Sequence, residues 1–273
     1  MSAQTMTSPR PGAAPEPGRT SRADLGPVTA VPFHRLLRVE LRKQADTRAG
    51  RWFLVLIGVI TAAVLVTLLV TGDGTRTFAD YFEGTVTPLQ ILLPVLAIMA
   101  ATSEWSQRTA MSTFTLEPRR GRVVLAKVLS SLLLGALLFV VATALAAVAQ
   151  LAGVVLRGAQ ADWSVPGWVL GGAAIVLTVF LLQGSAFGMA LLNTPAAIVA
   201  FFALPTAMSV VTVLVESWRE AMTWVDINQT TVPFFMGSAP SGEEWARFAV
   251  SMGVWVVLPM AIGVWRVLHR EVK

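Results

Sequence analysis

The chain has 273 residues, of which 55% are hydrophobic and 14% are charged, with a formal net charge of +5. Soluble domains carry about 25% charged residues, so this composition argues against a soluble globular protein. The chain has no cysteine, which excludes disulfides and thiolate chemistry. In so apolar a chain the positive charge is a guide to membrane orientation rather than a sign of nucleic-acid binding, and no nucleic-acid partner is expected.

The first part of the chain is polar. Residues 1–28 are rich in proline, glycine, alanine, serine and threonine, so a disordered tail is predicted. A basic amphipathic helix is predicted over 29–51, with leucines at helical spacing and basic residues such as Arg38 and Arg42 on the other faces. Such a helix lies on an anionic membrane surface or stands in solvent beside the membrane, and its composition favours the first.

Six apolar segments follow, each close to or above the roughly 18 to 20 residues that cross a bilayer. They are 52–70, 87–102, 128–156, 168–192, 195–215 and 248–265. None of them contains Asp, Glu, Lys, Arg or His. The predicted fold class is an all-α integral membrane protein, with a six-span domain over 52–273 after the amphipathic interfacial helix.

The distribution of Lys and Arg predicts the orientation. Seventeen of the 21 lie in the segments 1–51, 103–127 and 266–273, and the other four are Arg76, Arg157, Arg219 and Arg247. Because positive charges gather on the cytoplasmic side, both termini and the segment 103–127 are predicted to be cytoplasmic, in a multi-pass protein of the plasma membrane. The segment 216–247 is then the largest outer element.

Several kinds of chemistry lack the residues they need. No phosphate-binding loop occurs, and the spacing from Gly121 to Lys127 does not fit one. Neither histidine lies in a span, and no cluster of His, Cys, Asp and Glu suggests a metal site. We therefore expect no catalytic residue, no metal and no cofactor on this chain. Uncharged spans also disfavour a secondary transporter, which commonly uses intramembrane carboxylates.

Small and polar residues in the spans indicate packing. Gly167 with Gly171, and Gly184 with Gly188, have the four-residue spacing that lets helices approach closely, within the chain or at a dimer seam. Gln150 and Gln183 fall within predicted spans. Two interpretations are open. The favoured one is that these glutamines form hydrogen bonds between helices, and the other is that they line a translocation path.

The segment 103–127 is a hydrophilic interruption between two spans. A short helix is predicted over 104–116, and it should end at Glu117 because the residue before a proline disfavours the helical region. Arg119, Arg120 and Arg122 then form a basic corner before the next span. Their charge alone leaves two interpretations open. The arginines only satisfy the positive-inside bias, or they bind another protein.

This segment carries the most specific pattern of the chain. It reads Glu104, then Arg108-Thr109, Thr115, Pro118-Arg119-Arg120-Gly121-Arg122 and Lys127. The pattern resembles that of the permease subunits of bacterial type-2 ABC exporters, and the layout of spans extends the resemblance over about 33–270. One departure is Thr113-Phe-Thr-Leu, where that family usually has Leu-Thr closer to the proline, which leaves the register of the short helix open.

The resemblance implies a permease that dimerises with a second copy or a paralogue and binds separate ATP-binding subunits, which hold ATP and Mg. It implies that the amphipathic helix and the helix of 103–127 dock on those subunits. It also implies that Arg119 and Arg120 meet an acidic surface or orient the corner. Glu104 would pair with a neighbouring cation. The alternatives are a non-transporting immunity or scaffold protein and, less favoured, a secondary transporter. The substrate cannot be read from the sequence.

Overall fold

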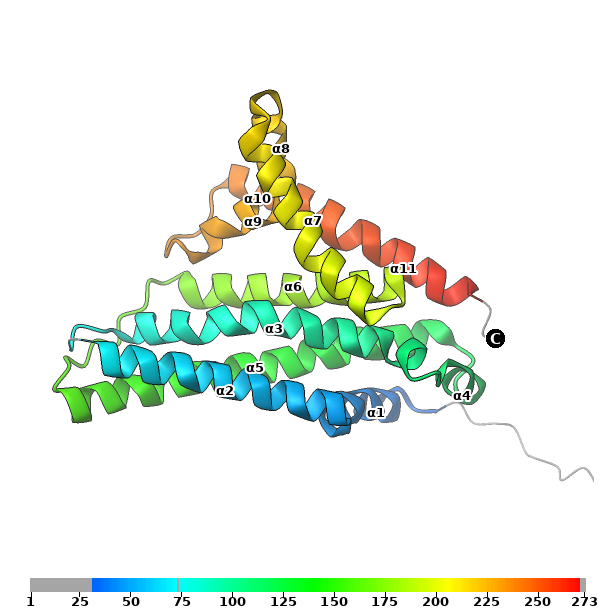
Figure 1. The fold of residues 1–273 in the computed structure, drawn as a ribbon, viewed down its shortest axis with the longest axis horizontal. Coiled ribbons are helices and arrows are strands. Elements are labelled where there is room, and N and C mark those ends of the chain that lie inside the picture. Colours follow the sequence, from blue (N-terminus) through cyan, green and yellow to red (C-terminus); the bar gives the residue numbers. More distant parts are fainter. Residues whose placement is uncertain (1–30, 73, 271–273) are drawn as a thin grey trace, which may run out of the picture. The chain divides into compact units, whose positions relative to one another are not determined.

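The computed structural model describes residues 31–72 and 74–270, so the predicted tail over 1–28 lies outside the described residues. All regular structure in these two stretches is helical (Figure 1). The α-helices are α1 (Phe33–Asp46), α2 (Arg48–Thr71), α3 (Phe78–Ser106), α4 (Ala110–Leu116), α5 (Arg120–Arg157), α6 (Val169–Leu191), α7 (Thr194–Leu214), α8 (Arg219–Val225), α9 (Ile227–Thr231), α10 (Gly242–Met252) and α11 (Leu258–His269). Two 3-10 turns, η1 (Glu216–Trp218) and η2 (Val232–Phe235), lie beside α8 and α9, and a π-helical turn, η3 (Gly253–Val257), joins α10 to α11.

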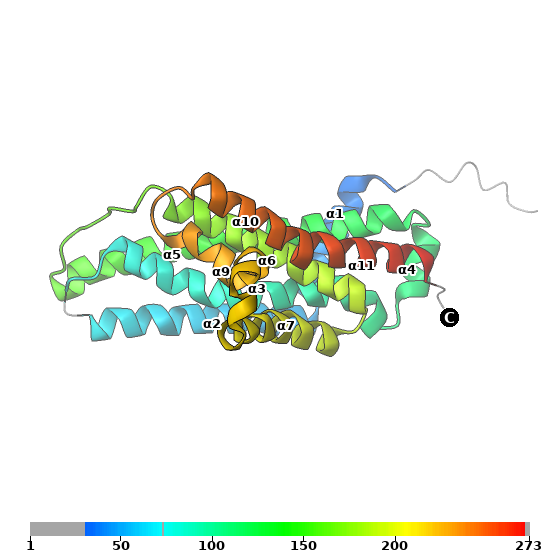
Figure 2. The same cartoon turned by 90° about the horizontal axis from the view of Figure 1, so that it is seen from above.

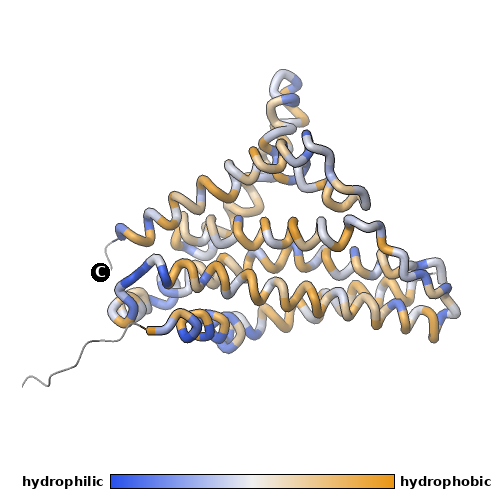
Figure 3. Tube along the Cα trace, turned by 180° about the vertical axis from the view of Figure 1, so that it is seen from behind, coloured by the Kyte–Doolittle hydropathy of each residue, from blue (hydrophilic) through white to orange (hydrophobic). Residues whose placement is uncertain are grey.

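Six helical segments are long and apolar enough to cross a membrane: α2, α3, α5, α6, α7 and the continuous segment from α10 through η3 to α11. This confirms the predicted all-α, six-span fold class. Figure 3 shows apolar residues along the shafts of these helices, whereas hydrophilic residues gather at α1 and near the helix ends. The chain is therefore built as a multi-pass membrane protein.

The helices extend beyond several of the predicted spans, and the predicted amphipathic helix is interrupted. Helix α3 begins at Phe78 rather than at position 87, because Thr77 and Asp80 form a capping box that satisfies its first backbone N–H groups. The amphipathic helix does not run unbroken to position 51, because Thr47 adopts an extended conformation and caps α2 by accepting a hydrogen bond from Gly50 N at 3.1 Å. Gly50 fits this corner since a Cβ there would lie 1.9 Å from the carbonyl oxygen of Gln44.

Helices α3 and α6 form the centre of the bundle. In their most apolar stretches 67% and 61% of the residues are buried, against 17% to 28% in the other four spans. Helix α3 packs against α2, α5 and α6, and α6 also packs against α11 and α7. Two residues, Leu192 and Asn193, separate α6 from α7, so these helices are antiparallel neighbours.

Seen from above, most of the spans run roughly along one direction (Figure 2). Helices α7 and α11 slope away from α6 and converge on the α8–α10 region (Figure 1). There Phe234 of η2 is fully buried, and its ring packs edge-to-face against Trp245 and at a tilt against Phe248. Trp255 of η3 donates a hydrogen bond from Nε1 to the carbonyl of Val225 at 2.7 Å, which ties the π-helical turn to α8.

Candidate functional site

Helix α1, the end of α3 and the start of α5 meet at one end of the bundle, and α4 and the end of α11 lie at the same end (Figures 1 and 2). We call this the basic end, because all but four of the chain's lysines and arginines fall in the segments that lie there or in the undescribed terminal residues. The other four are Arg76 and Arg157, beside the far ends of α2 and α5, and Arg219 and Arg247, in the α8–α10 region. The candidate site is at the basic end.

Four charged side chains from three helices form a closed network that we call the ionic cluster: Glu40 and Lys43 of α1, Glu104 of α3 and Lys127 of α5. Lys127 Nζ lies 2.7 Å from Glu40 Oε2 and 2.7 Å from Glu104 Oε1. Lys43 Nζ lies 2.6 Å from Glu40 Oε1 and 3.1 Å from Glu104 Oε1. Each lysine thus bridges both carboxylates, and the cluster holds the three helices together.

The ionic cluster has balanced charge and is almost dry. The side chains of Glu40, Glu104 and Lys127 are 3%, 2% and 7% exposed, whereas that of Lys43 is 35% exposed. Burial lowers the pKa of Lys43, but the charges of Glu104 and Glu40 outweigh it and hold the pKa above its usual value. Lys43 therefore stays protonated at physiological pH. Removing one partner from such a network leaves an uncompensated buried charge. The free-energy cost of that charge is far larger than the net stabilisation that the intact network provides.

Neutral polar groups complete the network. Lys127 Nζ also donates to the carbonyl of Ala100 and to Ser103 Oγ, both at 3.1 Å, and Ser103 Oγ donates to Glu104 Oε2 at 3.0 Å. Gln44, one turn after Glu40, donates from Nε2 to Ser130 Oγ at 2.7 Å. Its other amide atom, Oε1, is buried and has no hydrogen-bond partner in the part of the chain that the structure describes.

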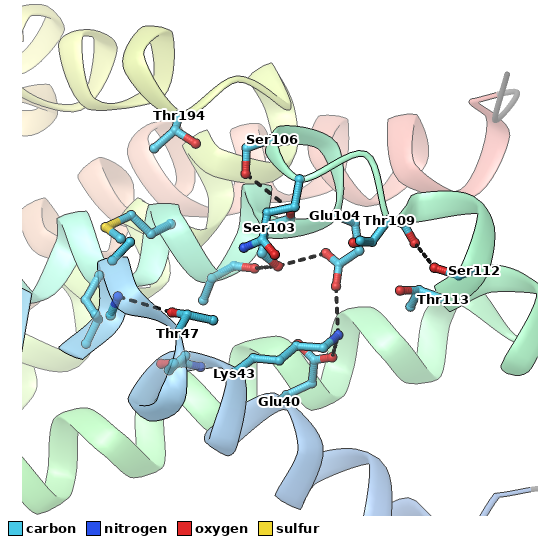
Figure 4. Close-up of a pocket in the computed structure, with 17 residues that line it drawn as sticks. Glu40, Lys43, Thr47, Ser103, Glu104, Ser106, Thr109, Ser112, Thr113 and Thr194 are labelled. Atoms are coloured by element: carbon cyan, nitrogen blue, oxygen red, sulfur yellow. Dashed lines mark hydrogen bonds and ion pairs between the residues drawn. The ribbon is translucent and has the colours of Figure 1, made fainter. Parts of the chain in front are cut away.

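A cavity of about 470 Å³ adjoins the ionic cluster (Figure 4). Glu40, Lys43 and Glu104 form one side of it, and Figure 4 shows Lys43 and Glu104 pointing toward one another there. Hydroxyl groups from α3, α4, the start of α7 and the corner before α2 line much of the rest, whereas Leu96 and Met99 supply an apolar wall. The cavity is therefore lined by both polar and apolar groups.

The basic corner between α4 and α5 is tied to two other parts of the chain. Arg120 donates from its guanidinium to the carbonyls of Val267 at 3.0 Å and Arg270 at 2.7 Å, at the end of α11. These are carbonyls that a helix end leaves without intrahelical partners, and a cation there also meets the negative end of the helix dipole. Arg122 pairs with Glu117 at 2.9 Å and donates to the carbonyl of Val31 at 2.6 Å.

Other predicted residues of the basic end face outward. Arg38 and Arg42 on α1, Arg108 before α4, and Pro118 and Arg119 after it are exposed. Within residues 31–72 and 74–270, the four arginine side chains of this set form no hydrogen bond or ion pair. On α4 itself Met111 is 59% and Leu116 is 79% exposed. The outward residues of α1, α4 and the basic corner form what we call the α1–α4 surface.

The short helix starts later than predicted. Glu104 belongs to the last turn of α3, and α4 begins at Ala110. Arg108 has a φ of 56°, in the left-handed region, and Thr109 N donates to the carbonyl of Glu104 at 2.9 Å. This is a Schellman-type end to α3, which fixes Glu104 in the last turn before the chain reverses. Helix α4 ends at Leu116, directly before Glu117-Pro118, as predicted.

The predicted packing glycines divide into two kinds. A Cβ at Gly184 would lie 2.5 Å from the carbonyl oxygen of Pro94, and one at Gly188 would lie 2.8 Å from Ala101 Cβ, so both sit where α6 closely approaches α3. A Cβ at Gly167 or Gly171 would meet open space in the described structure. Their neighbour Gly172, which sequence reasoning passed over, is the tightly packed one, because a Cβ there would lie 1.8 Å from the carbonyl oxygen of Phe234.

Both predicted glutamines are buried. Gln150 donates from Nε2 to the carbonyls of Gln160 and Asp162, each at 3.2 Å, and so anchors the loop between α5 and α6. Gln183 is buried in α6, and its Nε2 has no partner among the described residues. Neither glutamine lines the cavity at the basic end.

Sequence reasoning missed Glu40, Lys43 and Gln44 as members of a site. It assigned the buried face of α1 to apolar residues, but that face carries Leu36, Glu40 and Gln44 at four-residue spacing. The sequence does indicate this face, because one apolar and two polar residues recur along it at regular spacing. Glu104 at the start of segment 103–127 and Lys127 at its end were the possible partners.

Replacing Arg120 with methionine should lower the free energy of unfolding by about 2 kcal/mol, because charged hydrogen bonds to the carbonyls at the end of α11 are lost. The matched Arg119→Met variant should leave stability unchanged, since that side chain is exposed and unpaired in the described structure. Thermal unfolding in detergent, followed by tryptophan fluorescence, compares the two. Equal stability of the two variants would contradict a capping role for Arg120.

Among the described residues no group of three or more His, Cys, Asp or Glu side chains could hold a metal ion. The comparisons with known proteins found no protein-family model and no curated protein that match the chain. The site is therefore interpreted from its own geometry.

Proposed function

We propose that this chain is the membrane-spanning subunit of an ATP-driven exporter, and that its α1–α4 surface binds a separate ATP-binding subunit. The observation that carries the proposal is the surface itself, where exposed Met111 and Leu116 on α4 are flanked by the unpaired Arg108 and Arg119. Apolar side chains exposed beside charged ones outside the apolar shafts are typical of a protein interaction site.

The ionic cluster supports the proposal because it connects this surface to the spans. Glu40 and Lys43 lie on α1, and their partners Glu104 and Lys127 lie at the end of α3 and the start of α5. Helix α4 is the segment between these two ends. A displacement of α1 or α4 by a partner would therefore be transmitted to α3 and α5 through buried, short contacts rather than through a flexible loop.

Arg120 supplies a second connection. It lies where α4 turns into α5, and its guanidinium binds the end of α11 and stacks over Phe114 of α4, 4.8 Å from the ring centroid. Movement of the corner would thus also reach the last span. Because Arg120 is bound within the chain, we assign contact with the ATP-binding subunit to Arg108, Arg119, Arg38 and Arg42, and orientation of the corner to Arg120.

In this proposal ATP and Mg are held by the partner subunit, and export requires a second copy or a paralogue of this chain. The location is the plasma membrane, with both termini and the basic end in the cytoplasm, where an ATP-binding subunit has access to nucleotide. The positive-inside distribution of Lys and Arg supports this orientation.

Reversing the charge of Arg108 and Arg119 to glutamate should reduce the amount of ATP-binding subunit that copurifies with the tagged chain from native membranes by at least about tenfold. A cation patch that meets an acidic surface becomes repulsive when its sign is reversed. The amount of chain inserted in the membrane should not change, since neither side chain packs inside the bundle. Copurified protein is measured by mass spectrometry and by ATP hydrolysis.

The control is Arg219→Glu, an exposed arginine of α8 that lies away from the basic end. It should copurify the ATP-binding subunit at the wild-type level. A wild-type chain that brings down no ATPase would instead favour a non-transporting immunity or scaffold role. Normal copurification by the Arg108→Glu/Arg119→Glu variant would show that the α1–α4 surface is not the binding site.

A further inference from the structure

The start of α2 carries two positive charges that the described part of the chain does not neutralise. Arg48 and Arg51 are both exposed, and their side chains form no hydrogen bond or ion pair within residues 31–72 and 74–270. Because they are three residues apart on a helix, they lie at neighbouring positions of one face. The nearest acid in the sequence, Asp46 at the end of α1, is exposed and pairs with neither of them in the described structure.

The same face of α2 continues as an apolar surface. Trp52, Val55 and Val59 follow the arginines at three- and four-residue spacing, and they are 73%, 52% and 60% exposed. The buried residues of α2, among them Ile57 and Thr61, lie on the opposite side of the helix. Helix α2 is the least buried of the six spans, at 17%, and Figure 2 shows it along one edge of the bundle. In a membrane this face is therefore in contact with lipid.

The order of residues along this face matches the order of groups in a phospholipid. Tryptophan favours the boundary between headgroups and hydrocarbon, which places the two arginines at the level of the headgroup phosphates. From Trp52 to Val59 the helix rises roughly 10 Å, which lies within the about 15 Å of hydrocarbon in one leaflet. A guanidinium binds phosphate oxygens with two parallel N–H groups. The face thus offers phosphate binding first, then an indole, then an aliphatic wall.

Helix α1 is more basic than the start of α2, but it has little apolar surface to place in hydrocarbon. Its inward face packs on the bundle, where Leu36 is buried beside Val123 and Ala126 of α5. Among the large apolar residues of α1, all of which the structure describes, Val39 alone is exposed, at 49%. Of the two helices at this corner, α2 is therefore the one that can hold an acyl chain and a phosphate together.

The charge of the corner selects the class of headgroup. The exposed charged residues of 42–51 are three arginines and one aspartate, which gives a net charge of +2. Arginine stays protonated at any physiological pH. A zwitterionic lipid would bring a second cation, its ammonium or choline group, into this positive region. An anionic phospholipid brings the phosphate without that cation, so the corner favours it.

We propose that Arg48 and Arg51 bind the phosphate of an anionic phospholipid of the phosphatidylglycerol type. The glycerol backbone of the lipid lies beside Trp52, and an acyl chain lies along Val55 and Val59. The site is on the outer wall of one span rather than in a cavity. This inference requires the membrane-spanning fold but neither an ATP-binding partner nor a second copy of the chain.

The test uses the full chain, purified in detergent and exposed to an equimolar mixture of phosphatidylglycerol, phosphatidylethanolamine and phosphatidylcholine with the same acyl chains. Native mass spectrometry measures how much of each lipid stays bound. We expect phosphatidylglycerol to be retained about tenfold more than either zwitterionic lipid, because each arginine beside an anionic lipid contributes a several-fold preference. Equal retention of the three lipids by the wild-type chain would overturn the proposal.

The variant Arg48→Gln/Arg51→Gln should abolish this preference without affecting folding, since neither side chain has a partner within the described chain. The matched control Arg108→Gln/Arg119→Gln removes the same charge from two exposed, unpaired arginines of the α1–α4 surface, and it should keep the preference. An unchanged preference in the first variant contradicts the site. Equal loss in both variants also contradicts it, because the general positive charge of the basic end would then select the lipid.

A second measurement locates the bound lipid. Phosphatidylglycerol with a photoreactive diazirine in its acyl chain should label the peptide that contains Val55 and Val59. Unlabelled phosphatidylglycerol should compete with this labelling, and phosphatidylcholine should not. Labelling confined to other spans would place the lipid elsewhere and overturn the assignment to α2. Because these assays contain no ATPase, none of the outcomes depends on the exporter proposal.

Discussion

Replacement of Lys127 by methionine is expected to lower the free energy of unfolding by about 3 to 5 kcal/mol. Methionine fills a similar volume but removes the ammonium that lies 2.7 Å from both Glu40 and Glu104. Lys43 alone then faces two buried carboxylates, so one negative charge is left uncompensated in a dry site. Thermal unfolding in detergent and the yield of monodisperse protein measure the effect.

A double variant separates the charge imbalance from simple loss of packing. In Lys127→Met/Glu40→Gln, the remaining pair of Lys43 and Glu104 is neutral, so most of the lost stability should return. The exposed Arg119→Met serves as the control for removing a cation at this end. If Lys127→Met unfolds at the wild-type temperature, or if the double variant is less stable still, the ionic cluster does not hold the three helices together.

Replacement of Gly172 by alanine should lower the free energy of unfolding by about 3 kcal/mol, the upper part of the usual range for overpacking a close contact. The added Cβ would lie 1.8 Å from the carbonyl oxygen of Phe234 and 2.7 Å from its carbonyl carbon. Both are backbone atoms, so relief requires η2 to move away from α6. Loss of α8–α10 packing would appear as increased hydrogen exchange in that region.

The adjacent Gly171→Ala is the matched control, and its effect should have the opposite sign. A Cβ at Gly171 meets open space, and alanine favours a helix over glycine by about 1 kcal/mol. The two variants differ by one position and by the same methyl group. Equal destabilisation of both would show that α6 tolerates no Cβ in its first turns for reasons other than the contact with Phe234.

The sequence was sufficient for the architecture because membrane spans are long, apolar and separated by charged segments. All six spans and the end of α4 at Glu117-Pro118 were predicted. Helix α3 begins at Phe78, before the predicted span 87–102, because Thr77 and Asp80 form its capping box. A capping acid and a loop acid look alike in composition, and the Thr77-to-Asp80 spacing is what separates them.

The candidate site was only partly predictable. The family resemblance implied that Glu104 pairs with a neighbouring cation, and the structure pairs Glu104 with Lys43 and Lys127. The contribution of α1 was not predictable by hydrophobic periodicity, because Glu40 and Gln44 are polar residues on its buried face. Which glycine is tightly packed also depends on tertiary contacts, as Gly171 and Gly172 show.

The central position of α3 and α6 has a consequence for biogenesis. The two helices are each other's main neighbours, but all of α5 lies between them in the sequence. A chain made from its N-terminus inserts α3 while α6 has not yet been synthesised. The face of α3 around Pro94 and Ala101, which α6 later approaches at Gly184 and Gly188, is then open to lipid or to an insertion chaperone. Since α6 and α7 are linked by two residues, they enter as one hairpin, and the core is completed only when that hairpin arrives.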